Sequence, residues 1–171
     1  MADFLPAFEY VMQYEDSRHS WAVVTDNNSG QVVAGINSKA FPEEVAAIVA
    51  VAQDQRESLI QTFYRNKLWT PMMLGALDSQ DLASRVMDME TNAGEGAAGP
   101  ELQNAINTLT SNAVKVDGKV GPLTIAAANN QNQAALLNAF RAQRVAYYNE
   151  VAAKNPDDAQ YLKVWLARAA A

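Results

Sequence analysis

The sequence contains no cysteine in its 171 residues. Disulfide bonds, thiolate zinc sites and cysteine nucleophiles are therefore excluded. Histidine is nearly absent as well, since His19 is the single one. A lone histidine does not make a metal site, and without partner residues it gives little support for nucleophilic catalysis. The sequence therefore predicts no metal site.

Long apolar segments and an excess of basic charge are also missing. The longest apolar run spans Val45–Ala52, whereas a membrane-spanning helix needs about 20 residues, so no membrane insertion is expected. The first residues lack the basic and apolar segments of a secretory signal, which predicts synthesis in the cytoplasm without a visible signal peptide. The formal net charge of −6 argues against a nucleic-acid partner, because phosphate binding needs a basic face.

The patterns that are present indicate a mostly helical chain with one β-hairpin. Apolar residues make up 49 % of the sequence, enough for a substantial core in one domain, with or without a small appended subdomain. Two β-rich segments flank the turn-forming residues Asp26–Gly30, which predicts a hairpin over 21–36. Helices are expected over 4–15, from 41 to about 68 with a break near 53, from 78 or 79, from 100, from 122, over 132–154 and over 161–168.

Glu15 is the sharpest candidate for chemistry. It shares one face of the first predicted helix with Phe8, Val11 and Met12. A carboxyl group on an apolar face loses solvation, which favours its protonated form and suits a general acid for glycosidic cleavage. The alternative is a glutamate at a frayed helix end that pairs with Arg18 or His19. Spacing alone favours this alternative.

Asp26 is the second candidate. Glycosidases commonly use two carboxyl groups, and a hairpin after the first helix would bring Asp26 across a cleft from Glu15. The alternative is a turn-forming role, because Asp before Asn-Asn-Ser-Gly is an ideal turn residue. Tyr64 and Trp69 belong to an aromatic cluster. Such a cluster either packs in the core or forms a rim on which sugar rings stack, and the sequence leaves both roles open.

The order of these features resembles glycoside hydrolase family 108, lysozyme-like N-acetylmuramidases often found as phage endolysins or bacterial secretion activators. The resemblance extends over nearly the whole chain. It rests on Tyr14-Glu15, Asp26…Ser29-Gly30, Gly35-Ile36, Phe63-Tyr64…Leu68-Trp69, Leu82-Ala83…Asp88…Asn92-Ala93-Gly94, Leu102-Gln103, Asp117-Gly118…Gly121-Pro122…Thr124, Arg144…Tyr147-Tyr148 and Leu162…Trp165-Leu166…Arg168.

The resemblance implies a mostly α, lysozyme-like fold with one β-hairpin beside the active-site cleft. Residues 1–94 would form the catalytic part, and residues 95–171 a helical peptidoglycan-binding part packed on it as one compact unit. The implied function is hydrolysis of β-1,4 bonds between N-acetylmuramic acid and N-acetylglucosamine.

Site roles follow from the same resemblance. Glu15 would be the general acid, and Asp26 would stabilise developing positive charge or orient water. Tyr64, Trp69 and Asn92 would line the cleft for the glycan strand. No cofactor is implied, because acid–base chemistry needs none. The protein would act on the cell wall, in the periplasm or outside the cell, after non-classical export or lysis.

Two departures from the family pattern keep other functions open. Asp16 and Ser17 replace the two glycines that follow the family's glutamate, and Val33-Ala34 replaces a Thr-Asn-Tyr step. A non-catalytic wall-binding or secretion-associated protein that retains the fold is therefore the alternative. A third hypothesis is a toxin-like effector that needs a cognate inhibitor protein as a partner.

Overall fold

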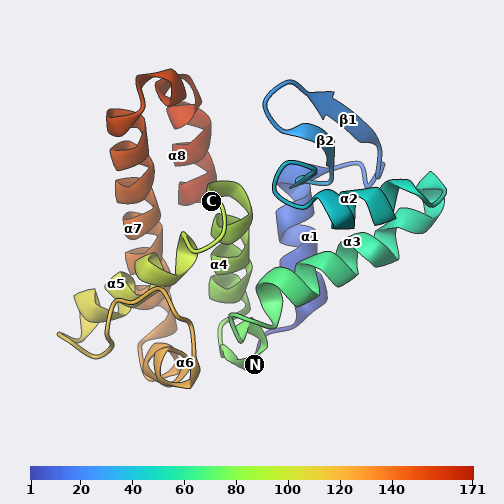
Figure 1. Ribbon diagram of the computed structural model, residues 1–171. Coiled ribbons are helices and arrows are strands. Elements are labelled where there is room, and N and C mark those ends of the chain that lie inside the picture. The colour runs from blue at the N-terminus through green and yellow to red at the C-terminus, as the bar shows by residue number, and fades with distance from the viewer.

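The computed structural model describes residues 1–171. Its first helix, α1 (Phe4–Glu15), packs alongside α4 (Gln80–Ala93), as Figure 1 shows. Phe8, Val11 and Met12 are fully buried, as expected of the apolar face of an amphipathic helix. The prediction of a helix over 4–15 with Glu15 at its end is confirmed.

A small antiparallel sheet follows α1. Its strands are β1 (Val23–Asp26), β2 (Gly30–Val33) and β3 (Ile36–Asn37), in the order β1-β2-β3. The register places Val23 opposite Val33 and Asp26 opposite Gly30, so the predicted hairpin is confirmed. The third strand was not predicted, because two residues are too few to show an alternating pattern.

Four short helical segments follow the sheet and form the right-hand side of the molecule in Figure 1. They are α2 (Pro42–Val49), the 3₁₀ turn η1 (Gln53–Gln55), α3 (Arg56–Tyr64) and the π-helical turn η2 (Arg65–Trp69). These segments confirm the predicted helical stretch from 41 to about 68 and its break near 53. A further 3₁₀ turn, η3 (Leu74–Ala76), connects this region to α4.

The C-terminal part is helical throughout. It consists of α5 (Ala98–Leu109), α6 (Pro122–Asn129), α7 (Gln133–Lys154), the 3₁₀ segment η4 (Pro156–Tyr161) and α8 (Leu162–Ala170). In Figure 1, α7 and α8 lie side by side next to α4. Side chains cap two of the helix N-termini: Ser79 accepts a hydrogen bond from the Leu82 amide, and Asn132 from the Ala135 amide.

One helix begins earlier than the sequence indicates. α5 starts at Ala98 and not at Pro100. The Glu90 carboxylate caps this start, because it accepts hydrogen bonds from the amides of Gly96 and Ala98. Glu90 ends the preceding helix and does not occupy the N-cap position of α5, so the usual N-cap pattern does not reveal this cap.

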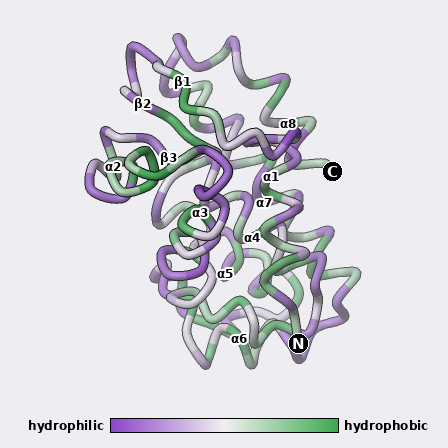
Figure 2. The backbone as a smooth tube through the Cα atoms, turned by 90° about the vertical axis from the view of Figure 1, so that its right-hand side faces the viewer, coloured by the Kyte–Doolittle hydropathy of each residue, from purple (hydrophilic) through white to green (hydrophobic).

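The hydrophobic core is continuous across both predicted parts of the chain. Its 33 buried residues include Phe8 from α1 and Phe140 from α7. Figure 2 shows the β1–β2 hairpin at one end of the molecule and α6 at the other. The predicted fold class, a mostly α lysozyme-like fold with one small hairpin, is confirmed. None of the helices combines the length and the apolar character needed to cross a bilayer.

Candidate functional site

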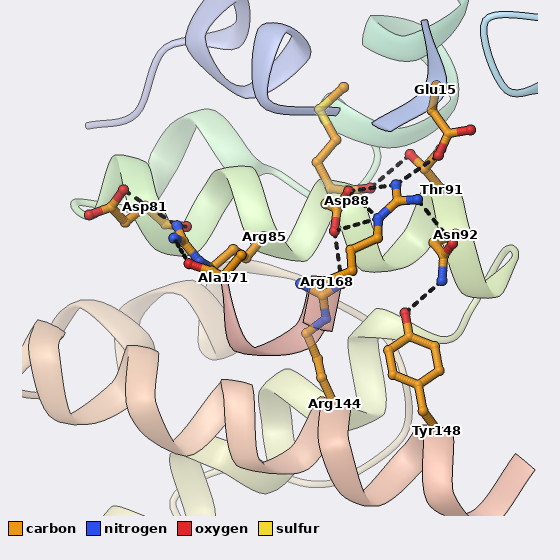
Figure 3. Close-up of polar contacts among 11 residues, drawn as sticks. Glu15, Asp81, Arg85, Asp88, Thr91, Asn92, Arg144, Tyr148, Arg168 and Ala171 are labelled. Carbon is orange, nitrogen blue, oxygen red and sulfur yellow. Dashed lines mark hydrogen bonds and ion pairs between the residues drawn. The ribbon is translucent and has the colours of Figure 1, made fainter. Parts of the chain in front are cut away.

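Glu15 ends α1 with its side chain about one-fifth exposed, at 19 %. Its Oε1 accepts a hydrogen bond of 2.7 Å from Nη2 of Arg168 on α8. Figure 3 shows the two side chains meeting from opposite ends of the chain. The expected pairing with Arg18 or His19 is wrong, because His19 pairs with Glu9 at 3.2 Å. The partner of Glu15 lies 153 residues away, which no local pattern reveals.

Arg168 is the centre of a buried ion cluster with Glu15, Asp88 and Arg144 (Figure 3). Asp88 is fully buried on α4 and accepts from Nε and Nη2 of Arg168, the latter at 2.6 Å. It also accepts a 2.8 Å bond from Nη2 of Arg144, which is fully buried on α7. The cluster contains two acids and two guanidinium groups, and such pairing is what makes buried charge tolerable.

The protonation of Arg168 follows from this environment. Burial by itself disfavours the charged guanidinium, but the hydrogen bonds and charge of Asp88, together with Glu15, raise the pKa of Arg168 above its ordinary value. Arg168 is therefore a permanent cation next to Glu15. Its aromatic contact with Tyr14, 4.4 Å from the guanidinium carbon to the ring centroid, adds cation–π stabilisation.

Asn92, predicted to contact the glycan, belongs to the same network. Its Oδ1 accepts a 3.0 Å bond from Nη1 of Arg168, and its Nδ2 donates to the Tyr148 hydroxyl at 2.9 Å. The three guanidinium nitrogens of Arg168 thus donate to three side chains, those of Asp88, Asn92 and Glu15. The amide of Asn92 is engaged by protein groups, and its contact with the glycan stays a prediction.

The second carboxylate oxygen of Glu15 faces Gly35 and Tyr64. A Cβ atom at Gly35 would lie 2.8 Å from Glu15 Oε2 and 2.9 Å from the Tyr64 hydroxyl, and Gly35 has φ of +78°. Only glycine fits this position without strain. The hydroxyl of Tyr64 donates to the Ala34 carbonyl at 2.8 Å. Burial, followed by the charge of Glu15, raises the pKa of Tyr64 well above its ordinary value, so the hydroxyl stays a donor.

A pocket of about 220 Å³ lies next to Gly35, although Glu15 itself is not one of its lining residues. Gly35 and Tyr64 line it together with Phe41 and Phe63, whose rings pack edge to face at 4.8 Å. Lys67 also lines the pocket and pairs with Glu44 at 2.7 Å. The pocket therefore combines apolar ring surface with polar groups, as ligand sites commonly do.

Asp26 lies at the exposed end of β1, in the hairpin turn. Its Oδ1 accepts hydrogen bonds of 2.8 Å from the amides of Asn28 and Ser29. These amides lower the pKa of Asp26, so the carboxylate is ionised at neutral pH. The contacts match the turn-forming alternative, and Asp26 does not line the pocket.

Trp69 is buried and packs edge to face on Phe4, with 5.8 Å between ring centroids. Gly75 packs closely on the same ring, since a Cβ atom added to Gly75 would lie 3.3 Å from the indole nitrogen of Trp69. Trp69 does not line the pocket, which agrees with core packing and not with a sugar-stacking rim. Of the three predicted glycan contacts, Tyr64 alone lines the pocket, and Asn92 contacts Arg168.

Arg168, Asp88 and Arg144 are not among the site residues that the sequence predicts. One signal could have found Arg144, because Phe140, Arg144 and Tyr148 are spaced four residues apart on one face of α7 and all are buried. A charged residue on a core stripe requires a buried partner of opposite charge. The described residues contain no group of three or more histidine or acidic side chains placed to hold a metal.

Comparisons with known proteins agree with a link to the cell wall. Residues 94–170, less than half of the chain, match the family model described as a predicted peptidoglycan domain. Peptidoglycan, the predicted partner, is thus supported by an independent finding. The whole chain is similar to the structure of Brucella abortus SagA, with a TM-score of 0.70 and 19 % identity over 98 % of this chain and 89 % of that chain. At this identity the likeness shows the fold alone. The sequence matches no curated protein.

Proposed function

We propose that this protein is a lysozyme-type glycoside hydrolase, related to family 108, that cleaves the β-1,4 bond between N-acetylmuramic acid and N-acetylglucosamine. The observation that carries the proposal is the place of Glu15. Its carboxyl group ends a rigid helix, is anchored through Oε1, and presents Oε2 to Gly35 and Tyr64 at the edge of a pocket. The family match of residues 94–170 supports peptidoglycan as the substrate class.

The chemistry requires one proton and one water molecule. The neutral carboxyl group of Glu15 donates its proton to the glycosidic oxygen while the bond from that oxygen to the muramic acid C1 breaks. Positive charge develops on the sugar ring, and water then adds to C1 and loses a proton to a carboxylate. The products are a reducing muramic acid end and a free 4-hydroxyl group on the glucosamine.

Asp26 is the second carboxyl group in this proposal. Its ionised state at neutral pH is the one needed to stabilise positive charge or to accept a proton from water. Both hydrogen bonds from Asn28 and Ser29 go to Oδ1. The oxygen that would serve the reaction is therefore Oδ2, to which neither amide donates.

The pocket beside Gly35 is the proposed glycan site. Phe41 and Phe63 offer apolar surface for the faces of sugar rings, and the side chain of Asn37 adds an amide for their polar groups. Such a mixture suits a chain of acetylated sugars, whose rings have apolar faces and polar edges.

Release of reducing ends from purified peptidoglycan tests the proposal. Wild type is expected to release them and Glu15→Gln is not, because the amide lacks the proton that Glu15 donates. Glu9→Gln, on the same helix but paired with His19, is the matched control and should retain activity. Activity that persists in Glu15→Gln would contradict the proposed site.

A wall-binding protein without turnover is the second candidate function. It is favoured by the ion pair that already occupies Glu15 and by the family match of residues 94–170. Its signature would be sedimentation of the protein with cell walls together with no release of reducing ends from any wall type. Either function requires the protein to reach the wall.

A further inference from the structure

The C-terminal helix α8 contributes a residue to the candidate active site. Residues 94–170 match a predicted peptidoglycan domain, yet Arg168 within them contacts Glu15 directly. Asp88 holds Arg168 through two nitrogens, and Arg144 holds Asp88 in turn. A side chain fixed by so many contacts has little rotamer freedom, which is a requirement for an accurate catalytic geometry.

We propose that Arg168 is a positioning residue that sets both the orientation and the charge balance of Glu15. This inference rests on the proposed function. The Arg168 guanidinium donates to Oε1 of Glu15, so Oε2 is the oxygen left to face Gly35 and Tyr64, two residues that line the pocket. The proton that reaches the substrate is therefore carried on Oε2.

Arg168 also acts after proton transfer. Donation converts Glu15 into a carboxylate, and a guanidinium at 2.7 Å stabilises that product and the transition state leading to it. Tyr64 from α3 also lies next to Glu15, while Asp88 from α4 and Arg144 from α7 surround Arg168 as a second, buried ion pair. Since Asp88 is neutralised by Arg144 as well, Arg168 keeps positive charge available for Glu15.

This arrangement gives residues 94–170 a role beyond holding the polymer. Arg168 connects the C-terminal part to the end of α1, over a sequence separation of 153 residues. The N-terminal part alone would contain Glu15 without the group that orients it. The candidate active site is therefore complete only when α8 is docked on α4.

The test compares Arg168→Lys with Arg141→Lys in the full chain. Lysine at 168 retains the charge that Asp88 needs, but one ammonium group cannot hold Asp88, Asn92 and Glu15 at once. We expect kcat to fall by about 100-fold with KM unchanged, because the acid is misplaced while the pocket is intact. Arg141 donates to the carbonyl of Ala171 at the end of the same helix. Its lysine variant should keep wild-type kcat.

The split between kcat and KM separates positioning from a purely structural role, because a misplaced acid lowers kcat alone whereas a disrupted fold changes both constants. Asn92→Ala provides a milder second variant in case Arg168→Lys does not fold. It removes one anchor of Arg168, and kcat should fall while KM stays constant.

The outcomes are distinguishable. If wild type is inactive, or Glu15→Gln is active, the proposed function fails and the inference falls with it. If wild type is active and Glu15→Gln is not, but the folded Arg168→Lys or Asn92→Ala protein keeps wild-type kcat, only the role of Arg168 is refuted. A rise in KM with constant kcat in Asn92→Ala would also contradict positioning, because it would indicate substrate contact.

Discussion

Gly35→Ala is the substitution for which the structure gives the most definite expectation. The residue has φ of +78°, which costs a residue with a side chain about 1–2 kcal/mol. The new methyl group would meet Glu15 Oε2 at 2.8 Å and the Tyr64 hydroxyl at 2.9 Å. If Tyr64 moves, its hydrogen bond to the Ala34 carbonyl is lost, which costs about 1 kcal/mol more.

The expected destabilisation is therefore about 2–3 kcal/mol, which corresponds to a fall in Tm of roughly 5–10 °C for a chain of this size. The effect on activity should be larger. Glu15 is held at Oε1 by Arg168, so relief of the clash must displace the carboxyl group or break the ion pair. A displacement of about 1 Å is expected to lower kcat by about 100-fold.

Gly118→Ala is the matched control. Gly118 has φ of +75° in the C-terminal part, and its added Cβ would meet only Pro100, at 3.6 Å. Thermal unfolding should therefore show a loss of Tm in both variants, while reducing-end release at a temperature where both are folded should fall only in Gly35→Ala. Equal activities of the two variants would refute the assignment of Gly35 to the active-site wall.

Three further predictions concern other parts of the molecule. Asp26→Asn keeps the turn-forming acceptor but removes the charge, so activity on peptidoglycan should fall in this variant as far as in Asp26→Ala; recovery in the asparagine variant alone would leave only the turn role. Ser79→Ala removes the N-cap of α4 and should lower the free energy of unfolding by about 1 kcal/mol in urea denaturation, and no change would exclude a capping role. Hydrogen bonds from the Gln103 side chain and the Lys119 amide lower the pKa of Asp117. The stability that these hydrogen bonds contribute is therefore present above the unfolded-state pKa and lost as pH falls through the lower folded-state pKa. The free energy of unfolding, measured between pH 7 and pH 2, should therefore fall less in Asp117→Asn than in wild type.

Local sequence patterns were sufficient to predict the helix and the hairpin that carry Glu15 and Asp26. The apolar spacing of Phe8, Val11 and Met12 placed Glu15 at the end of α1, and turn chemistry placed Asp26 in the hairpin. Both are consequences of interactions within a few residues. The same is true of the start of α6 at Pro122.

The environment of Glu15 could not be predicted in this way. Its partner Arg168 comes from the last helix, and the cap of α5 comes from Glu90 on α4. These contacts depend on how helices pack and not on the order of residues within them. Desolvation alone suggested an isolated acid at Glu15, whereas the structure places a permanent cation beside it. Trp69 shows the same limit for an aromatic residue. Its place in the aromatic cluster fits a glycan-binding rim as well as core packing, and only the fold shows that packing on Phe4 buries it.

Analysis of the fragments released from purified peptidoglycan tests the central claim most directly. After borohydride reduction, mass spectrometry distinguishes fragments that end in reduced muramic acid from those that end in reduced glucosamine. Wild type should release fragments with muramic acid ends, and Glu15→Gln should release none. Glucosamine ends, or equal release by both proteins, would contradict muramidase action with Glu15 as the acid.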